Sequence, residues 1–264
     1  MPYVVQFKID LTFQPINQKG IILLPSLMFE NTHQFIPYSR EYWLTILFFA
    51  LLGGFIFTFA KKQTEANKWL IGEAMSWTLV ATFTSYMLVK IRLGTFDAAE
   101  DLPFHLCNVC VYLSPFFLHT RRKELYFALF CWVMSGTLQG IITPNIAEGF
   151  PHFNFLRYWL IHGGLVMLML YSTFILGFRM TFKGAMTAFF AIQLYAIFAF
   201  SMNFLLRANY AFLNQKPAHA SLFDVLGGYP YYLISLEGVA ILLFLACWLP
   251  FWIANVTNTS FEHR

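Results

Sequence analysis

The chain contains very little charge. Only 11% of its 264 residues are Asp, Glu, Lys or Arg, whereas soluble domains contain about 25%. The 17 basic and 13 acidic residues are scattered and form neither a basic block nor an acidic tail, so the sequence does not indicate nucleic-acid binding. Hydrophobic residues account for 58% of the chain. This composition is typical of a protein embedded in a lipid bilayer.

Cysteine is also scarce, and the chain has no clear targeting leader. The four cysteines, at positions 107, 110, 131 and 247, lie in apolar segments, which argues against an extracellular disulfide framework. The first 40 residues lack the basic, apolar and small-residue order of a cleavable signal peptide. We expect residues 1–40 to form an interfacial arm and residues 41–264 to form one helical domain.

Seven apolar runs have about the 20 residues that a membrane span needs. Internal repeats of the kind found in many transporters are not evident. The sequence therefore predicts an all-α, polytopic bundle of seven transmembrane helices. The predicted spans are 42–60, 69–89, 102–119, 125–143, 153–176, 186–206 and 230–254.

Three short connections at 61–68, 120–124 and 177–185 are rich in Lys and Arg. Basic residues in short loops favour the cytoplasmic side of a membrane. This pattern predicts an outside N-terminus and a cytoplasmic C-terminus.

The third run begins with the unusual stretch LPFHLCNVCVY. Pro103 fits the first turn of a helix, where a missing N–H is tolerated. Polar and reactive side chains, among them His105 and Cys107, follow at once. Such groups in a membrane helix generally have a function.

Polar residues of five predicted spans fall at similar depths. At a rise of ~1.5 Å per residue, Cys107 lies about 8 Å, His162 about 14 Å and Glu237 about 10 Å inside their spans from one side. Gln139 and Asn203 each lie about one turn from the same side. This agreement predicts a shared polar cavity, although separate structural hydrogen bonds would also explain each residue.

The spacing around Cys107 leaves several roles open. Cys110 follows at i+3 and shares its helix face, which would suit a redox pair or a metal site. His105 follows Asp101 at i+4 and could pair with it. Only His105, Cys107, Cys110 and His162 could plausibly meet at a metal, and two widely spaced pairs are weak evidence for one. We expect neither a metal nor another cofactor.

Connections on the same side of the membrane add candidates for substrate contact. Asn145 follows the fourth span, and the long sixth-to-seventh connection contains Asn209, Tyr210 and Lys216. The aromatic residues of this connection suit a membrane interface. Lys216 could meet a phosphate or a carboxylate, or simply be solvated.

Several of these motifs together resemble a known family. LPFHLC, GTLQGIITPNIAEGFPHF, WLIHGG, NYAFLNQKP, SLFDVLG and YPYYL follow in order over about 42–251. They are similar to the bacterial YwaF-like membrane proteins, relatives of animal transmembrane protein 164. The resemblance implies a seven-helix membrane protein. For the animal relative it implies a phospholipid acyltransferase with an acyl-cysteine intermediate, whose cysteine and histidine match Cys107 and His162 here.

The residue chemistry fits this activity. Cysteine is a strong nucleophile at neutral pH, and a nearby histidine can accept its proton. Asp101, Asn203 or Glu237 could orient His162, and Gln139, Asn203 or backbone N–H groups could hold an oxyanion. The expected partners are membrane phospholipids and lysophospholipids. The alternatives are a transporter or channel that uses the same cavity, a thiol redox protein that uses Cys107 and Cys110, and a sensor or assembly module without turnover.

Overall fold

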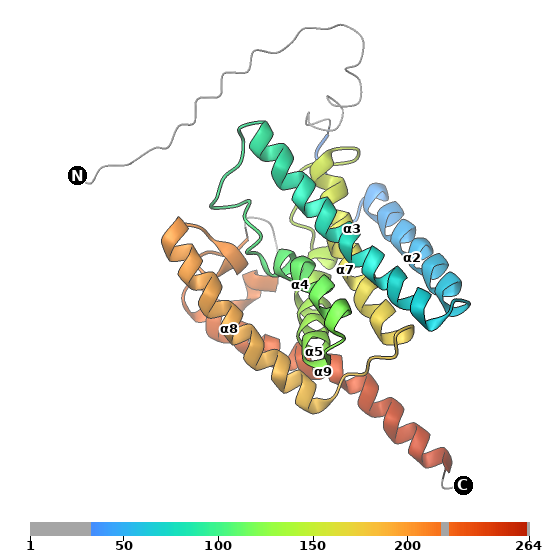
Figure 1. Ribbon diagram of the computed structural model, residues 1–264. Helices are drawn as coiled ribbons and strands as arrows, with labels where there is room; N and C mark the ends of the chain where they lie inside the picture. The colour runs from blue at the N-terminus through green and yellow to red at the C-terminus, as the bar shows by residue number, and fades with distance from the viewer. Residues whose placement is uncertain (1–32, 218–221, 263–264) are drawn as a thin grey trace, which may run out of the picture.

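A computed structural model of the protein describes residues 33–217 and 222–262 (Figure 1). Most of the predicted N-terminal arm, residues 1–32, lies outside the described residues. The described part of the arm pairs with the connection before residue 153: Gln34 and Glu148 form an antiparallel bridge, and the Phe35 N–H donates to the Ala147 carbonyl. Phe35 is buried and its ring contacts those of Phe155 and Trp159.

The described residues fold into seven helical segments. They form helices throughout, apart from connections and the single bridge. The segments are α2 (Arg40–Lys61), α3 (Glu65–Arg92), α4 (Leu106–Thr120), a continuous α5 (Lys123–Trp132), η1 (Val133–Thr137) and α6 (Leu138–Ile142), then α7 (Phe153–Phe174), α8 (Phe182–Leu206) and α9 (Tyr231–Glu262). The prediction of an all-α protein is confirmed, and each predicted span corresponds to one segment.

Local sequence explains where several helices begin. Ser39, Thr64 and Thr181 precede α2, α3 and α8, and each side-chain oxygen accepts a hydrogen bond from an N–H of the first turn. Such N-caps satisfy donors that have no acceptor within the helix.

The third helix begins later than predicted. Leu102–Phe104 form a turn, and α4 begins at Leu106 after an extended N-cap residue, His105. Pro103 therefore does not lie in the first helical turn. The Phe104 carbonyl accepts a hydrogen bond from the hydroxyl of Tyr195 on α8, so a tertiary contact holds the turn outside the helix.

The helix formed by α5, η1 and α6 widens in its middle. Val133–Thr137, with the sequence VMSGT, adopts a π-helix between two α-helical halves. A π segment inserts one extra residue per turn, and such segments are frequent at functional sites. Here it turns Ser135, Gly136 and Thr137 toward the interior of the bundle, where they line a cavity.

The exterior of the bundle is apolar, as in an integral membrane protein. Five of the described helices are long and apolar enough to cross a membrane: α2, α5 with η1 and α6, α7, α8 and α9. Large side chains such as Phe55, Leu194 and Phe204 are exposed on α2 and α8, and a soluble monomer rarely exposes so large an apolar surface. The other two predicted spans differ: α4 has only 15 residues, and α3 contains many hydroxyl side chains.

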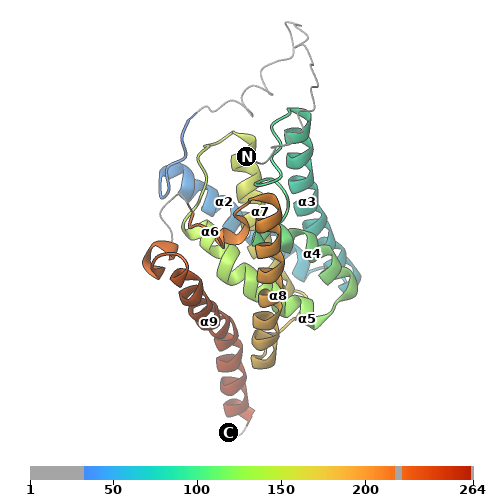
Figure 2. The same cartoon turned by 90° about the vertical axis from the view of Figure 1, so that its left-hand side faces the viewer.

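The connections gather at two ends of the bundle. At one end Trp69, near the start of α3, contacts Arg121 after α4 and Phe178 after α7, so the three predicted basic connections lie together. At the other end the hydroxyl of Tyr210, after α8, contacts Ala98 and Leu102, which precede α4. In Figure 2, α8 runs down the middle of the view and α9 lies to its left.

Candidate functional site

A cavity of about 400 Å³ opens to the exterior near the end of the bundle that holds Tyr210. This volume lies within the range of small-molecule sites. One wall is polar and comes from the start of α4, the π segment, α6 and α7. The opposite wall comes from α8 and α9 and is largely apolar, apart from Glu237 on α9. The polar wall consists of His105, Cys107, Asn108, Ser135, Thr137, Gln139, Asn145, Arg157, Tyr158 and His162. The apolar wall includes Ile192, Tyr195, Ala196, Leu236, Val239, Ala240, Leu243 and Phe244.

Cys107 lies in the first turn of α4 and faces this cavity. Its thiol donates a weak hydrogen bond of 3.7 Å to the Oδ1 atom of Asn108. The side chain of the N-cap residue His105 accepts no hydrogen bond from the first turn of α4. The positive end of a helix dipole stabilises negative charge, and here that end lies beside the Cys107 thiol.

His162 lies on α7 and lines the same cavity. Its Nδ1 atom is 2.8 Å from the Tyr158 carbonyl oxygen. A carbonyl can only accept a hydrogen bond, so Nδ1 carries the proton and Nε2 has a free lone pair. The ring stacks on Tyr158, with 4.1 Å between ring centroids. His162 is therefore held in the tautomer and orientation that a general base needs.

Tyr158 and Gly140 fix the position of the His162 ring. The Tyr158 hydroxyl donates to the Gly140 carbonyl at 2.6 Å and accepts from the Asn145 N–H at 3.2 Å. A Cβ atom on Gly140 would lie 2.6 Å from Cδ2 and 2.8 Å from Nε2 of His162. Only glycine at this position leaves room for the ring. The sequence shows Gly140 and Tyr158, but not that they meet His162.

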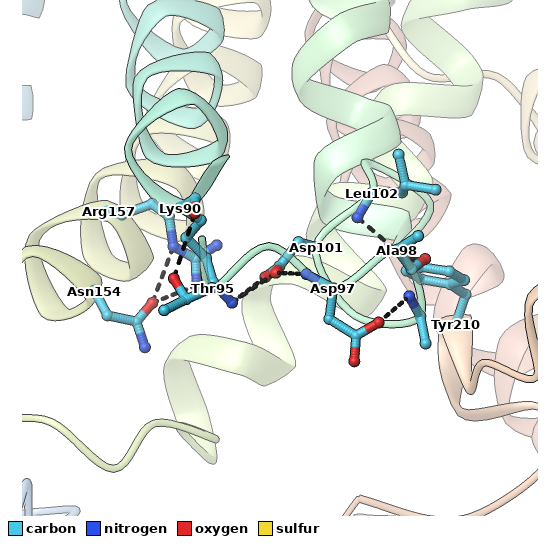
Figure 3. Close-up of polar contacts among 10 residues, drawn as sticks. Lys90, Thr95, Asp97, Ala98, Asp101, Leu102, Asn154, Arg157 and Tyr210 are labelled. Atoms are coloured by element: carbon cyan, nitrogen blue, oxygen red, sulfur yellow. Dashed lines mark hydrogen bonds and ion pairs between the residues drawn. The ribbon is translucent and has the colours of Figure 1, made fainter. Parts of the chain in front are cut away.

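His105 also lines the cavity, although it precedes Cys107 by only two residues. The two share an environment because His105 is an extended N-cap residue and not part of a regular helix. The expected pairing of Asp101 with His105 is wrong. Asp101 is buried and forms an ion pair of 2.6 Å with Lys90, and it also accepts from the Asp97 N–H (Figure 3).

Gln139, Asn145 and Glu237 are three further predicted residues that the structure places in the cavity lining. Glu237 accepts a 2.8 Å hydrogen bond from Gln193, which joins α9 to α8. Neither Glu237 nor Asp101 orients His162, because the Tyr158 carbonyl has that role. Gln139 offers an amide donor on the polar wall.

Asn203 lies outside the described cavity lining and is not available to orient a histidine or hold an oxyanion. Its side-chain amide donates to the Tyr210 carbonyl and accepts from the Tyr210 N–H. Tyr210 in turn accepts from the Leu102 N–H and donates to the Ala98 carbonyl. Burial raises the pKa of the Tyr210 hydroxyl to about 12, so it remains a donor. This pair holds the segment before α4 in place.

Two other predicted substrate contacts also lie apart from the described lining. The Asn209 side chain bonds only within its own connection, to the backbone of Asn214 and Gln215. The Lys216 ammonium lies 5.9 Å from the centre of the Tyr232 ring. Neighbouring residues of the same connection, Phe212 and Pro217, do line the cavity.

Several polar groups of the cavity were not predicted from the sequence, among them Arg157 and Thr137. Arg157 occupies the second turn of α7 and supplies a cation to the polar wall. Thr137 is buried, and among the described residues its hydroxyl has no hydrogen-bond partner. An arginine near the outer end of a predicted span was a usable signal for the first. The π segment that turns Thr137 inward left no recognisable pattern.

The remaining cysteine of the LPFHLCNVC stretch points elsewhere. Cys110 is fully buried in the main apolar core, outside the described cavity lining. All four cysteines are free thiols. Within the described residues no three His, Cys, Asp or Glu side chains are grouped as metal ligands.

Comparison with known proteins identifies a family for this chain. A family model described as "TMEM164 family" matches residues 29–248. The chain belongs to the TMEM164 family. The match includes both walls of the cavity and every polar residue of its lining.

One relative is similar to part of the chain. A protein of Treponema pallidum (strain Nichols), named only "Uncharacterized protein", is 25% identical over 152 residues. These residues are 58% of this chain and 63% of that protein, so the chain spans less than two thirds of its relative's length. No solved structure matches the chain.

Proposed function

We propose that this protein is a membrane acyltransferase that moves a fatty acyl chain between phospholipids and lysophospholipids through an acyl-cysteine intermediate. The observation that supports this proposal is the cavity itself. It joins a thiol at a helix N-terminus, an oriented histidine and a long apolar wall that opens to the exterior. Membership in the TMEM164 family and the resemblance to YwaF-like proteins point to the same activity.

The first half of the reaction forms a thioester. The Nε2 atom of His162 accepts the Cys107 thiol proton, and the thiolate attacks the carbonyl carbon of a phospholipid ester. The N–H groups at the start of α4 and the Gln139 amide would stabilise the oxyanion. When the intermediate collapses, the ester C–O bond breaks, and the leaving lysophospholipid takes the proton from His162.

The second half reverses these steps with a new acceptor. His162 removes the proton from the hydroxyl of another lysophospholipid, whose oxygen attacks the thioester. The C–S bond then breaks, and the Cys107 thiolate recovers the proton from His162. Because Cys107 bonds to Asn108 in the structure, the thiol must rotate, or one water must intervene, before the proton moves.

The arrangement in the membrane forms part of the same proposal. We place all seven helical segments across the bilayer of the bacterial cytoplasmic membrane, with the connections at 62–64, 121–122 and 175–181 in the cytoplasm. The basic residues of this end of the bundle favour that side. The cavity then opens in the outer half of the bilayer, where the ester groups of phospholipids lie.

Intact mass spectrometry of the purified protein tests the mechanism. We expect a mass increase that matches a fatty acyl chain, is removed by neutral hydroxylamine and disappears in Cys107→Ala. Cys110→Ala is the matched control, because that thiol is buried outside the cavity lining, and it should retain the adduct. An adduct that persists in Cys107→Ala, or no adduct after incubation with phospholipid, would contradict the proposal.

The two principal alternatives give different results. A transporter that uses the cavity would require Glu237 but tolerate Cys107→Ala. A thiol redox protein would lose function in Cys110→Ala, yet burial of Cys110 in the core does not favour a redox partnership.

A further inference from the structure

Arg157 lines the cavity, and among the described residues it forms no ion pair with an acidic side chain. The ion pairs among the described residues join His33 to Glu41, Lys68 to Glu65, Lys90 to Asp101 and Arg122 to Glu124. Lys90, on the adjacent end of α3, is thus neutralised by Asp101 (Figure 3). Arg157 is a cation at membrane level without a compensating carboxylate, an arrangement that generally reflects a function.

The guanidinium group of Arg157 is held along one edge by hydrogen bonds and on one face by an aromatic ring. Asn154 Oδ1 accepts hydrogen bonds from Nε at 3.0 Å and from Nη2 at 2.6 Å. The guanidinium lies 4.3 Å from the centre of the Tyr86 ring. Asn154 is itself held by Glu148, to which its amide donates. Neutral and aromatic groups therefore orient Arg157 without cancelling its charge.

The opposite edge of the guanidinium is open. Within the described residues Nη1 has no hydrogen-bond partner, while Arg157 lines the cavity beside the polar wall. Its charge interacts electrostatically with His105, Cys107 and His162. The Nη1 and Nη2 donors of arginine form a fork that matches two oxygens of a phosphate.

We propose that Arg157 binds the phosphate of the phospholipid headgroup and thereby directs the ester group to Cys107. This inference rests on the proposed function for the nature of the substrate, but it concerns a binding group that acts before any bond changes. Phosphate at Arg157 leaves the acyl chain to lie along the apolar wall of α8 and α9. The reacting ester then lies between the two, beside Cys107 and His162.

Binding measurements on protein that cannot react separate this inference from the chemistry. The Cys107→Ala protein in a maltoside detergent is titrated with palmitoyl lysophosphatidylcholine and with monopalmitoylglycerol, which lacks the phosphate. We expect the phosphate-bearing lipid to bind about 10- to 100-fold more tightly, as for a hydrogen-bonded charged pair. Equal affinity for the two lipids would overturn the proposal.

Further substitutions in the same background identify the cation. Arg157→Gln should abolish the preference for the phosphate-bearing lipid and leave monopalmitoylglycerol binding unchanged, whereas Arg157→Lys should retain part of the preference. Arg121→Gln is the matched control, because Arg121 also lies over an aromatic ring, 4.1 Å from Trp69 at the other end of the bundle. It should behave as the parent protein does. Loss of the preference in Lys216→Gln but not in Arg157→Gln would contradict the assignment.

Inorganic phosphate distinguishes the source of the anion. If the headgroup is the ligand, inorganic phosphate should displace the lysolipid only weakly, since it lacks the acyl chain. Equal affinity for inorganic phosphate would overturn the headgroup assignment. A preserved phosphate preference without any acyl adduct would contradict the proposed function alone. An acyl adduct without a phosphate preference would contradict this inference alone.

Discussion

The two walls of the cavity come from helices in very different surroundings. In the most apolar stretch of α7, half of the residues are buried inside the protein, and the same holds for the helix that contains the π segment. In α8 and in α9 the buried share is only 11%. His162 and Thr137 are thus buried in the protein, apart from the cavity that they line. The apolar wall instead belongs to helices that mostly face lipid.

This difference separates two tasks. Reactive groups need fixed geometry, which the buried helices provide through contacts such as Tyr158 on His162. In the proposed function an acyl chain needs an apolar path from the bilayer, and the largely apolar lining from α8 and α9 would provide one. Changes in the polar wall should therefore alter the rate, and changes in the apolar wall should alter the choice of chain.

Loss of the nucleophile is the most severe test of the polar wall. Cys107→Ala should abolish acyl exchange between phospholipids and lysophospholipids, measured with isotope-labelled acyl chains in proteoliposomes. Cys107→Ser should retain a trace at most, because a hydroxyl is a weaker nucleophile. Cys110→Ala should remain near the unmodified protein. Comparable losses in both alanine variants would mean that Cys107 has no special place in the wall.

Removal of the base should have the next largest effect. His162→Ala should lower the exchange rate by about 10²- to 10⁴-fold, the usual contribution of a general base. His119→Ala is the control, since His119 is exposed near the opposite end of α4. Exchange that continues at the normal rate in His162→Ala would remove the histidine from the mechanism.

Displacement of the base, without its removal, tests the importance of rigid geometry. Gly140→Ala should push the His162 ring away from the cavity, because the new Cβ would lie 2.6 Å from Cδ2. A shift of about 1 Å in a catalytic group can cost about 100-fold in rate. Gly54→Ala, where no atom lies within 4 Å of the added Cβ, should leave the rate unchanged. The comparison fails if the two alanine variants have the same rate.

A change in the apolar wall should have the smallest effect on rate and the clearest effect on selectivity. Ala240 lines the cavity from α9, and Ala240→Phe should fill part of the acyl path. We expect the ratio of rates for short and long acyl donors to rise by about 10-fold, as when a hydrophobic pocket loses room for a methylene group or two. Leu242→Phe is the control: it places a ring on the exposed face of the same helix and should leave the ratio unchanged.

Much of the fold could be predicted because the bilayer constrains it strongly. The apolar runs gave the helical segments to within about four residues, apart from the C-terminal end of α9, which continues to Glu262. That the protein lies in a membrane and belongs to this family also followed from the sequence. The depth of Cys107, His162, Gln139 and Glu237 in their spans indicated one cavity, and the structure places all four in its lining.

The partners of individual side chains required the tertiary structure. Asp101 and His105 are four residues apart, yet Lys90 from α3 takes the carboxylate, because the segment before α4 is not helical. Asn203 lies near the depth of the cavity but bonds to the Tyr210 backbone. Depth along a helix follows from the residue number, whereas the direction of a side chain depends on which neighbour reaches it.

The sequence by itself determined an all-α membrane protein with a cysteine and a histidine near one end of its helices, because hydrophobic length and local spacing are properties of short segments. Only the tertiary structure decided that Tyr158 orients the histidine, that Gly140 leaves room for it, and that Arg157 and not Lys216 faces the cavity. These outcomes depend on the rotation of packed helices and on a π segment, which no single stretch of sequence specifies.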